Sequence, residues 1–287
     1  MSVTLKTWTK LGLGSALAGA TLAACSPSEQ AEEPAAEAEV TETATEPEAE
    51  VVETEVAAPV GEGEGEGGEG EGGVSISAAN TDPVVYNAAL AITEAHIIAA
   101  RDAHALGETD AAAEMFAHPV SEVLFDMEEV FVARGVEDFS DMLTEASLAV
   151  INGADANEVA TKSDAIIATL RAAAEKAPDN GQTQTQIGAG VAADQIERAA
   201  DMYLVAAGDE AYEPYLDGYG FYKAGEAAFN QVSADLATSD PESATAITAA
   251  LALLGEAYPS AVRPDSLDQD TAALTVAASN VVLAVGN

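Results

Sequence analysis

From Asp82 onward, the apolar residues of this 287-residue chain recur with helical spacing. Asp82 is suited to cap a helix N-terminus. Pro83 suits the first helical position, because proline lacks the N–H that a helix leaves unpaired there. Gly107 follows the segment, as glycine commonly does at helix C-termini. These signals predict a long helix whose apolar positions are Val84, Val85, Ala88, Leu90, Ile92, Ile97 and Ile98.

Similar signals predict that the rest of the chain is helical as well. Thr109 or Asp110 can cap a second helix at residues 111–133, in which Pro119 predicts a kink and after which Gly135 ends the helix. Short connections and the lack of alternating β-branched runs predict an all-α fold, an up-and-down bundle of about seven to eight helices over residues 81–287. The further helices are expected at about residues 138–153, 155–178, 185–207, 213–238, 240–258 and 267–283.

Residues 26–73 cannot supply a hydrophobic core. They hold sixteen glutamates and no lysine or arginine, and they end in a Gly-Glu repeat. Such a composition predicts a solvated, self-repelling chain, so residues 25–80 are expected to form a disordered acidic tether before the bundle. An alternative role for the glutamates is loose binding of Ca²⁺ or other cations through carboxylate oxygens.

The first 25 residues have the pattern of an export signal. Lys6 and Lys10 precede an apolar stretch at residues 11–20, and residues 22–25 read Leu-Ala-Ala-Cys. This pattern resembles the signal of a bacterial lipoprotein, which implies removal of residues 1–24 and acylation of Cys25. Cys25 is the only cysteine, so no intrachain disulfide can form. Because Ser26 follows it rather than an aspartate, we expect an outer-membrane anchor with the bundle facing the periplasm.

The charge of the chain limits its partners. The formal net charge is −40, so nucleic acids and anionic lipid surfaces are poor partners. Metal cations and basic proteins are better ones. The same acidity would also serve solubility in salty water, an explanation that needs no ligand.

The histidines suggest a metal site. His118, Glu122 and Asp126 are spaced i, i+4 and i+8, so they share one face of the second predicted helix, and His96 on the first helix could meet them. Imidazole and carboxylate donors from facing helices suit Fe, Zn, Cu or Mn. His104 is turned about 80° from His96 around the helix and is not expected to share the ion. In the alternative interpretation, the histidines satisfy backbone carbonyls and the carboxylates face solvent.

A second candidate site lies where most of the tyrosines cluster. Tyr215, Asp217 and Tyr222 could line a ligand pocket at the start of the helix expected at residues 213–238. The alternative is that these tyrosines pack in the core while their hydroxyls reach water.

Three parts of the folded region carry a family resemblance. They are the helix pair with the histidines, the Tyr215-Leu-Asp217 step with Phe221 after it, and the sequence Tyr-Pro-Ser-Ala-Val at residues 258–262. Together they resemble the imelysin-like, metal-associated bundles and the periplasmic helical domains attached to bacterial iron permeases. The Gly-x-His-x-x-Glu motif of imelysins is absent, because the acidic residue after His118 comes four positions later, at Glu122. The resemblance implies periplasmic handling of iron or copper.

Motifs of catalysis are missing from the sequence. It contains no Gly-x-Ser-x-Gly, no His-Glu-x-x-His and no phosphate-binding glycine loop after a strand, which favours a non-enzyme. We therefore expect a lipid-anchored binding or accessory protein that handles an iron or copper ion in uptake or delivery, with an envelope transport protein as a candidate partner. The alternative is a structural or protein-interaction lipoprotein of the envelope with no metal site.

Overall fold

A computed structural model describes residues 73–208 and 210–286. Within these ranges the chain is all-α and contains no strand, which confirms the predicted fold class. The predicted signal peptide, Cys25 and the tether up to residue 72 lie outside the described residues. The helices are α1 (Ile76–Ala79), α2 (Pro83–Ala105), α3 (Thr109–Pro119), η1 (Val120–Leu124), α4 (Phe125–Arg134), α5 (Ser140–Ile151), α6 (Ala156–Ala174), α7 (Gln184–Gly208), α8 (Glu213–Ser239), α9 (Pro241–Ala257) and α10 (Thr271–Val285).

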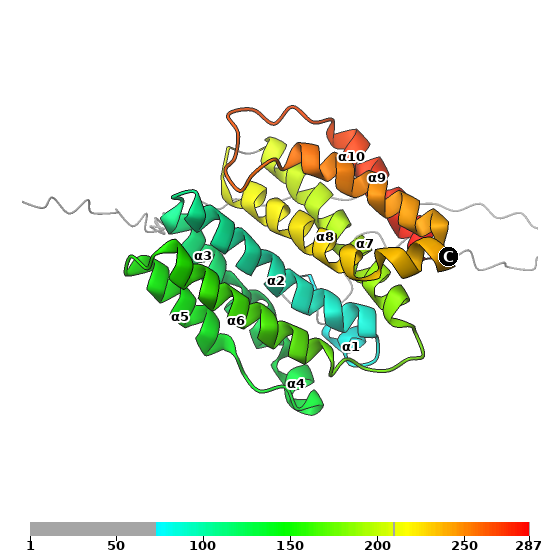
Figure 1. Cartoon of the computed structure of the whole chain (residues 1–287), viewed down its shortest axis with the longest axis horizontal. Helices are drawn as coiled ribbons and strands as arrows, with labels where there is room; N and C mark the ends of the chain where they lie inside the picture. The colour runs from blue at the N-terminus through cyan, green and yellow to red at the C-terminus, as the bar shows by residue number, and fades with distance from the viewer. Residues whose placement is uncertain (1–72, 209, 287) are drawn as a thin grey trace, which may run out of the picture. The chain divides into compact units, whose positions relative to one another are not determined.

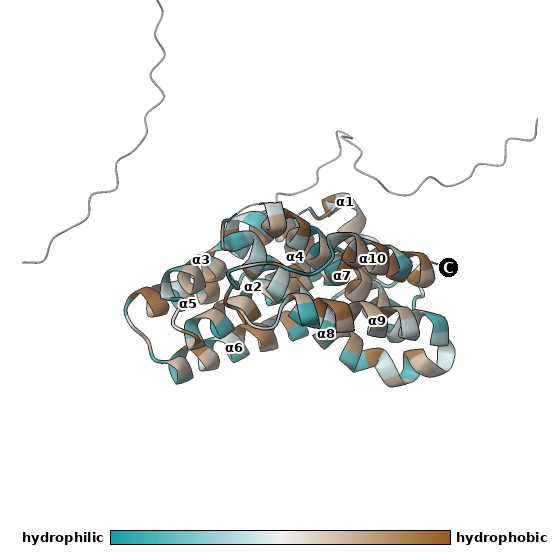
Figure 2. Cartoon of the chain, turned by 90° about the horizontal axis from the view of Figure 1, so that it is seen from above, coloured by the Kyte–Doolittle hydropathy of each residue, from teal (hydrophilic) through white to brown (hydrophobic). Residues whose placement is uncertain are grey.

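The bundle consists of two groups of helices that meet where α2 packs against α7 and α8 (Figure 1). Helices α3 to α6 gather around α2 on one side, and α9 and α10 lie with α7 and α8 on the other. Neighbours in the chain, such as α7 with α8 and α9 with α10, pack side by side, as an up-and-down bundle requires. Figure 2 shows hydrophobic and hydrophilic residues interleaved along these helices, the pattern of elements with one buried face.

Helix α2 is the central element of the domain. Among the described helices it alone has the length and composition to span a membrane, yet 83% of its most apolar window is buried inside the bundle. It contacts α3, α6, α7 and α8, which explains why its apolar residues are not confined to one stripe. Asp82 caps it as predicted, since its carboxylate accepts a hydrogen bond from the Val84 N–H at 2.8 Å.

The second predicted helix is divided by a π-helical turn. Helix α3 runs to Pro119, η1 follows immediately, and α4 continues to the predicted stop at Gly135, which has a positive φ of 68°. The irregularity begins at the predicted kink, because proline cannot donate the hydrogen bond of a regular helix. A π turn holds more residues than an α turn, so it changes which side chains share a face.

Two helix starts differ from the predictions. Glu108 stands at the N-cap of α3 without a side-chain hydrogen bond, while Thr109 and Asp110, the predicted caps, lie inside the first turn. The last helix begins at Thr271 rather than near residue 267, because Asp270 caps it by accepting hydrogen bonds from the next turn. These differences in the start residues do not change which helices pack against one another.

The folded region includes residues before the expected boundary at 81. Val74 and Ala79 are buried, and α1 packs against α2. The Arg198 guanidinium donates to the Gly73 carbonyl at 3.1 Å, which connects this segment to α7. The short stretch from residue 73 to 80 therefore belongs to the bundle.

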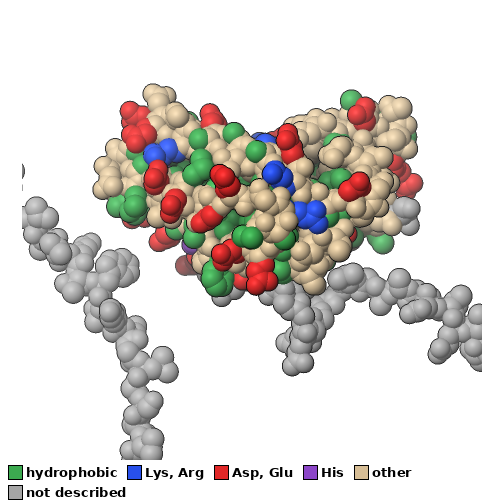
Figure 3. All heavy atoms as spheres, turned by 90° about the horizontal axis from the view of Figure 1, so that it is seen from below, with side chains coloured by type: hydrophobic (Ala, Val, Ile, Leu, Met, Phe, Trp, Pro, Cys, Tyr) green, Lys and Arg blue, Asp and Glu red, His purple; other side chains and the backbone are tan. Residues whose placement is uncertain are grey.

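Acidic side chains outnumber basic ones on the surface. Figure 3 shows Asp and Glu scattered over one face of the domain with few Lys and Arg among them. Residues 74–287 hold 34 of the 50 acidic residues of the chain and 8 of its 10 basic residues. Cations are therefore attracted toward the domain from solution.

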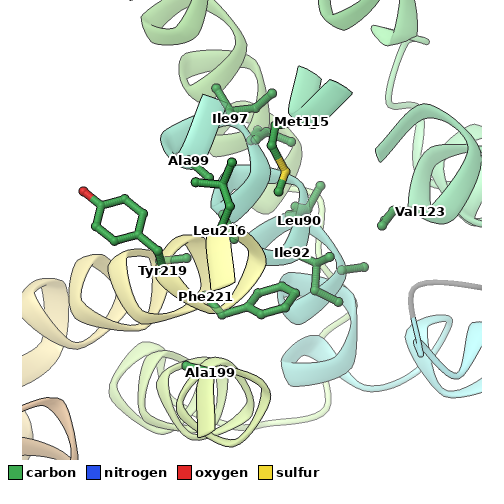
Figure 4. Close-up of a cluster of buried hydrophobic side chains, with 14 of the residues drawn as sticks. Leu90, Ile92, Ile97, Ala99, Met115, Val123, Ala199, Leu216, Tyr219 and Phe221 are labelled. Carbon is green, nitrogen blue, oxygen red and sulfur yellow. The ribbon is translucent and has the colours of Figure 1, made fainter. Parts of the chain in front are cut away.

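A glycine lets α8 approach α2 closely. A Cβ at Gly220 would lie 2.5 Å from the Ala95 carbonyl oxygen, so only glycine fits this contact. Next to it, the Phe221 side chain reaches toward α2 (Figure 4) and packs edge-on against the His96 ring, with 5.9 Å between the ring centroids. This close crossing brings Asp217 of α8 opposite His96.

Candidate metal centre

His96 is buried in the middle of α2, with 4% of the residue exposed. Its Nδ1 lies 2.8 Å from the Ile92 carbonyl oxygen one turn earlier. Because a carbonyl can only accept, Nδ1 carries the proton and Nε2 keeps its lone pair. Burial lowers the pKa of His96 to about 4, so the ring is neutral at pH 7. Metal-binding histidines commonly show this arrangement, a neutral ring whose other N–H is held by a carbonyl or carboxylate.

Glu122 lies between the two imidazoles of the site. It comes from η1, whereas His118 lies near the end of α3. One Glu122 oxygen, Oε2, is 3.6 Å from His96 Nε2, and the other, Oε1, is 3.9 Å from His118 Nδ1. The two rings lie edge to face with 6.1 Å between centroids. The fold therefore brings together His96, His118 and Glu122, as the sequence predicted.

Helix α8 adds two carboxylates, one turn apart. Asp217 Oδ1 lies 3.6 Å from His96 Nε2, and Glu213 Oε1 lies 3.8 Å from His118 Nε2. Asp217 Oδ1 is buried, and no described residue donates a hydrogen bond to it. Burial, and then the charges of Glu213 and Glu122, raise the pKa of Asp217 to about 7. A buried oxygen without a donor is costly unless a cation or water compensates it.

The distances suit a single ion after a small contraction. His96, His118 and Asp217 each present one ligand atom, and these atoms lie within 4.8 Å of one another. Donors at roughly 2.0–2.2 Å from a common ion lie at most about 4.4 Å apart. The side chains would therefore move by less than about 1 Å to close on an ion. Glu122 and Glu213 stand beside this group, each with a carboxylate oxygen 3.6–3.9 Å from an imidazole nitrogen.

Two residues weighed in the sequence analysis do not join the group. Asp126 lies in the first turn of α4 and is not among the described residues whose ligand atoms converge. Its predicted place rested on uniform α-helical spacing, whereas the π turn between Glu122 and Asp126 rotates the face that follows. His104 is also outside the group, as expected from its turn around α2.

The tyrosines of the second candidate site serve mainly in packing. The Tyr215 hydroxyl donates to the Ser260 carbonyl at 2.9 Å, and its ring packs against Tyr258. Tyr222 stacks on the same Tyr258 ring, with 6.4 Å between centroids. Of the three predicted pocket residues, only Asp217 belongs to the metal-ligand group, which consists of His96, His118 and Asp217. These contacts favour the packing alternative for Tyr215 and Tyr222.

A cavity of about 250 Å³ borders the site beside α3 and the start of α8. Three of its lining residues are polar and come from this region of the site, namely Glu114, His118 and Glu213. The first two are one helical turn apart on α3, so both side chains face the same space. The cavity therefore places two carboxylates beside His118.

Asp217 and Glu213 are the ligand candidates that sequence reasoning did not place with the histidines. A usable signal was present, because the two acids are spaced i, i+4 near the start of a helix and so share one face. The sequence did not indicate which helix packs against that face of α8. In the structure it is α2, which α8 approaches closely at Gly220.

Comparisons of the chain with protein-family models, with curated proteins and with solved structures found no match.

Proposed function

We propose that this protein is a lipid-anchored envelope protein whose helical domain binds a transition-metal ion between α2, α3 and α8 for uptake or delivery. The observation that carries the proposal is the pairing of a buried, donor-free Asp217 Oδ1 with the free lone pair of His96 Nε2, 3.6 Å apart. Asp217 Oδ1 has no hydrogen-bond donor among the described residues, and His96 Nε2 faces the carboxylates of Asp217 and Glu122. An ion between them would satisfy both.

Iron is the ion that this donor set suits best. Two imidazoles with one carboxylate form the 2-His-1-carboxylate set typical of non-haem Fe(II). The flanking Glu122 and Glu213 add hard oxygen donors, whereas Cu(I) prefers thiolate and thioether ligands. Copper remains the second candidate, as Cu(II), because imidazole also binds it well.

The remaining parts of the proposal rest on the sequence. The lipoprotein-like signal with Cys25 supports a membrane anchor, and the glutamate-rich tether supports a domain held away from the membrane surface. The lack of catalytic motifs supports binding rather than catalysis. Delivery to an envelope transport protein is the role we propose for the bound ion.

A metal titration of the full chain tests the site. We expect Fe(II), added anaerobically, to bind with micromolar affinity in calorimetry and to raise the melting temperature, because an ion that binds only the folded state stabilises it. Cu(II), Zn(II) and Mn(II) are titrated in parallel to rank the ions. The affinity for Fe(II) should fall by about tenfold or more in His118→Ala and in Asp217→Asn.

His104→Ala is the matched control, since it removes a histidine of the same hairpin that lies outside the group. It should bind Fe(II) as the unaltered chain does. Weak binding by the sixteen tether glutamates is the same in every variant and sets the background. If no ion binds above that background, or if the His104 and His118 variants lose binding equally, the metal proposal is wrong.

A further inference from the structure

A second cavity, larger than the one at the histidines, lies in a groove formed by α2, α6, α7 and α8. Its volume is about 580 Å³, within the range of small-molecule sites. Polar residues of the loop between α6 and α7, including Asp179 and Gln182, form part of its rim. Its apolar floor consists of Leu90, Ala91, Ile187, Val191, Ala224 and Ala228.

One carboxylate is buried in the wall of this groove. Glu94 of α2 is only 5% exposed and pairs with the Arg171 guanidinium, which donates to its Oε1. The groove thus has a buried acid in its wall, and the partner of that acid, Arg171, is exposed to water.

The lining as a whole is acidic. Glu175 and Asp179 join Glu94, and Arg171 is the one basic residue among the described residues that line the groove. The Arg171 side chain is 44% exposed, so water screens its charge more than that of Glu94. Amide side chains of Asn87 and Gln231 add neutral hydrogen-bonding groups. The field in the groove therefore favours a cation over an anion.

The groove is distinct from the metal-ligand group. Glu94 and His96 are two residues apart on α2, which places them about 200° apart around the helix. His96 faces Asp217 near the start of α8, whereas the groove meets α8 from Ala224 onward. The two sites use opposite sides of the same central helix.

We propose that this groove binds a small organic amine, with its ammonium group against the Glu94 carboxylate and its aliphatic body along the apolar floor. The ammonium group is attracted because the described lining holds three carboxylates and one guanidinium. The aliphatic body lies against the apolar side chains that line the groove. A carboxylate ligand would meet Glu94, Glu175 and Asp179 as like charges, with the partly exposed Arg171 as its only opposite charge in the described lining.

The test uses two probes with the same six-carbon body and opposite charge, hexylamine and hexanoate. Each is titrated into the full chain by calorimetry in the presence of a metal chelator, so that the metal-ligand group plays no part. We expect saturable binding of hexylamine and none of hexanoate. Glu94→Gln should weaken hexylamine binding by about tenfold or more, because it removes the charge and keeps the shape.

Two further variants keep the outcome decisive. Ala228→Phe fills the groove without touching the ion pair and should also abolish hexylamine binding, which settles the matter if Glu94→Gln proves unstable in thermal melting. Glu158→Gln on the exposed face of α6 is the control and should bind normally. Equal binding of the two probes, binding that survives both groove variants, or no saturable hexylamine binding below about 10 mM overturns the proposal.

Discussion

The pKa shifts of His96 and Asp217 make the free energy of unfolding change with pH in opposite directions. The pKa of His96 falls from 6.5 to about 4, so lowering the pH from 6.5 to 4 protonates the unfolded chain but not the folded one and reduces the free energy of unfolding. The pKa of Asp217 rises from 3.8 to about 7, so raising the pH from 4 to 7 ionises Asp217 in the unfolded chain but not in the folded one, and this also reduces the free energy of unfolding. Between pH 4 and 6.5 the two contributions to the pH dependence of the free energy of unfolding cancel.

Asp217→Asn should therefore leave only the contribution of His96 to the pH dependence of the free energy of unfolding. In the metal-free protein we expect the free energy of unfolding of the variant, relative to the unaltered chain, to rise by about 1 kcal/mol per pH unit from pH 4 to 6.5. Urea denaturation followed by circular dichroism at several pH values measures it. Asp164→Asn, an exposed acid on α6, should give a curve parallel to that of the unaltered chain. A parallel curve for Asp217→Asn would contradict the burial of the pair.

At this scale, the sequence predicted part of the site. Spacing placed His118 and Glu122 on one helix face, because helical periodicity fixes which side chains share a face. That His96 could meet them rested on the expected packing of the two helices. The prediction assigned Asp126 rather than Asp217 to this group, because the neighbouring carboxylate depends on which helix packs across from α2 and not on local spacing. Long-range packing of this kind leaves no mark in a single sequence.

Among the elements, the crossing of α2 and α8 controls the site. Gly220→Ala would set a Cβ 2.5 Å from a backbone oxygen of α2, which cannot rotate away. We expect a loss of about 1–3 kcal/mol in the free energy of unfolding, together with weaker Fe(II) binding, because α8 must shift and carries Asp217 with it. Thermal melting and calorimetry measure the two effects.

Gly208→Ala is the matched control for that substitution. Gly208 ends α7, and a Cβ there would meet no atom within 4 Å. It should cost no stability and leave Fe(II) binding unchanged. If Gly220→Ala were as harmless as this control, the close approach of the two helices would not hold in solution.

The helices themselves were largely predictable, and the reason is local. Asp82, Asp155 and Asp240 cap helices at the predicted places, and each accepts a hydrogen bond from the first turn. The π turn of η1 was not predictable, because Pro119 predicts a break in the α-helix but does not determine which kind of turn follows. That turn sets Glu122 between the two histidines, so the least predictable element is part of the site.

On the scale of the whole molecule, the proposal joins a signal, an acidic tether and a folded domain. Under this proposal, the glutamate-rich segment would separate the domain from the membrane. An anchored domain of this kind samples a limited volume near the membrane, where a transport protein would receive the ion. The arrangement works only if the lipid on Cys25 exists.

The anchor is tested by Cys25→Ser in a bacterium that processes lipoproteins. The unaltered chain should incorporate labelled fatty acid and partition into detergent, because acyl chains gain about 0.8 kcal/mol for each buried CH₂ group. The variant should incorporate no label and stay in the aqueous phase. Ser26→Ala keeps the cysteine and should remain lipidated. If the unaltered chain carries no label, the anchor proposal is wrong. We expect the Cys25→Ser protein to bind Fe(II) as the unaltered chain does, which would show that the metal site does not depend on the lipid.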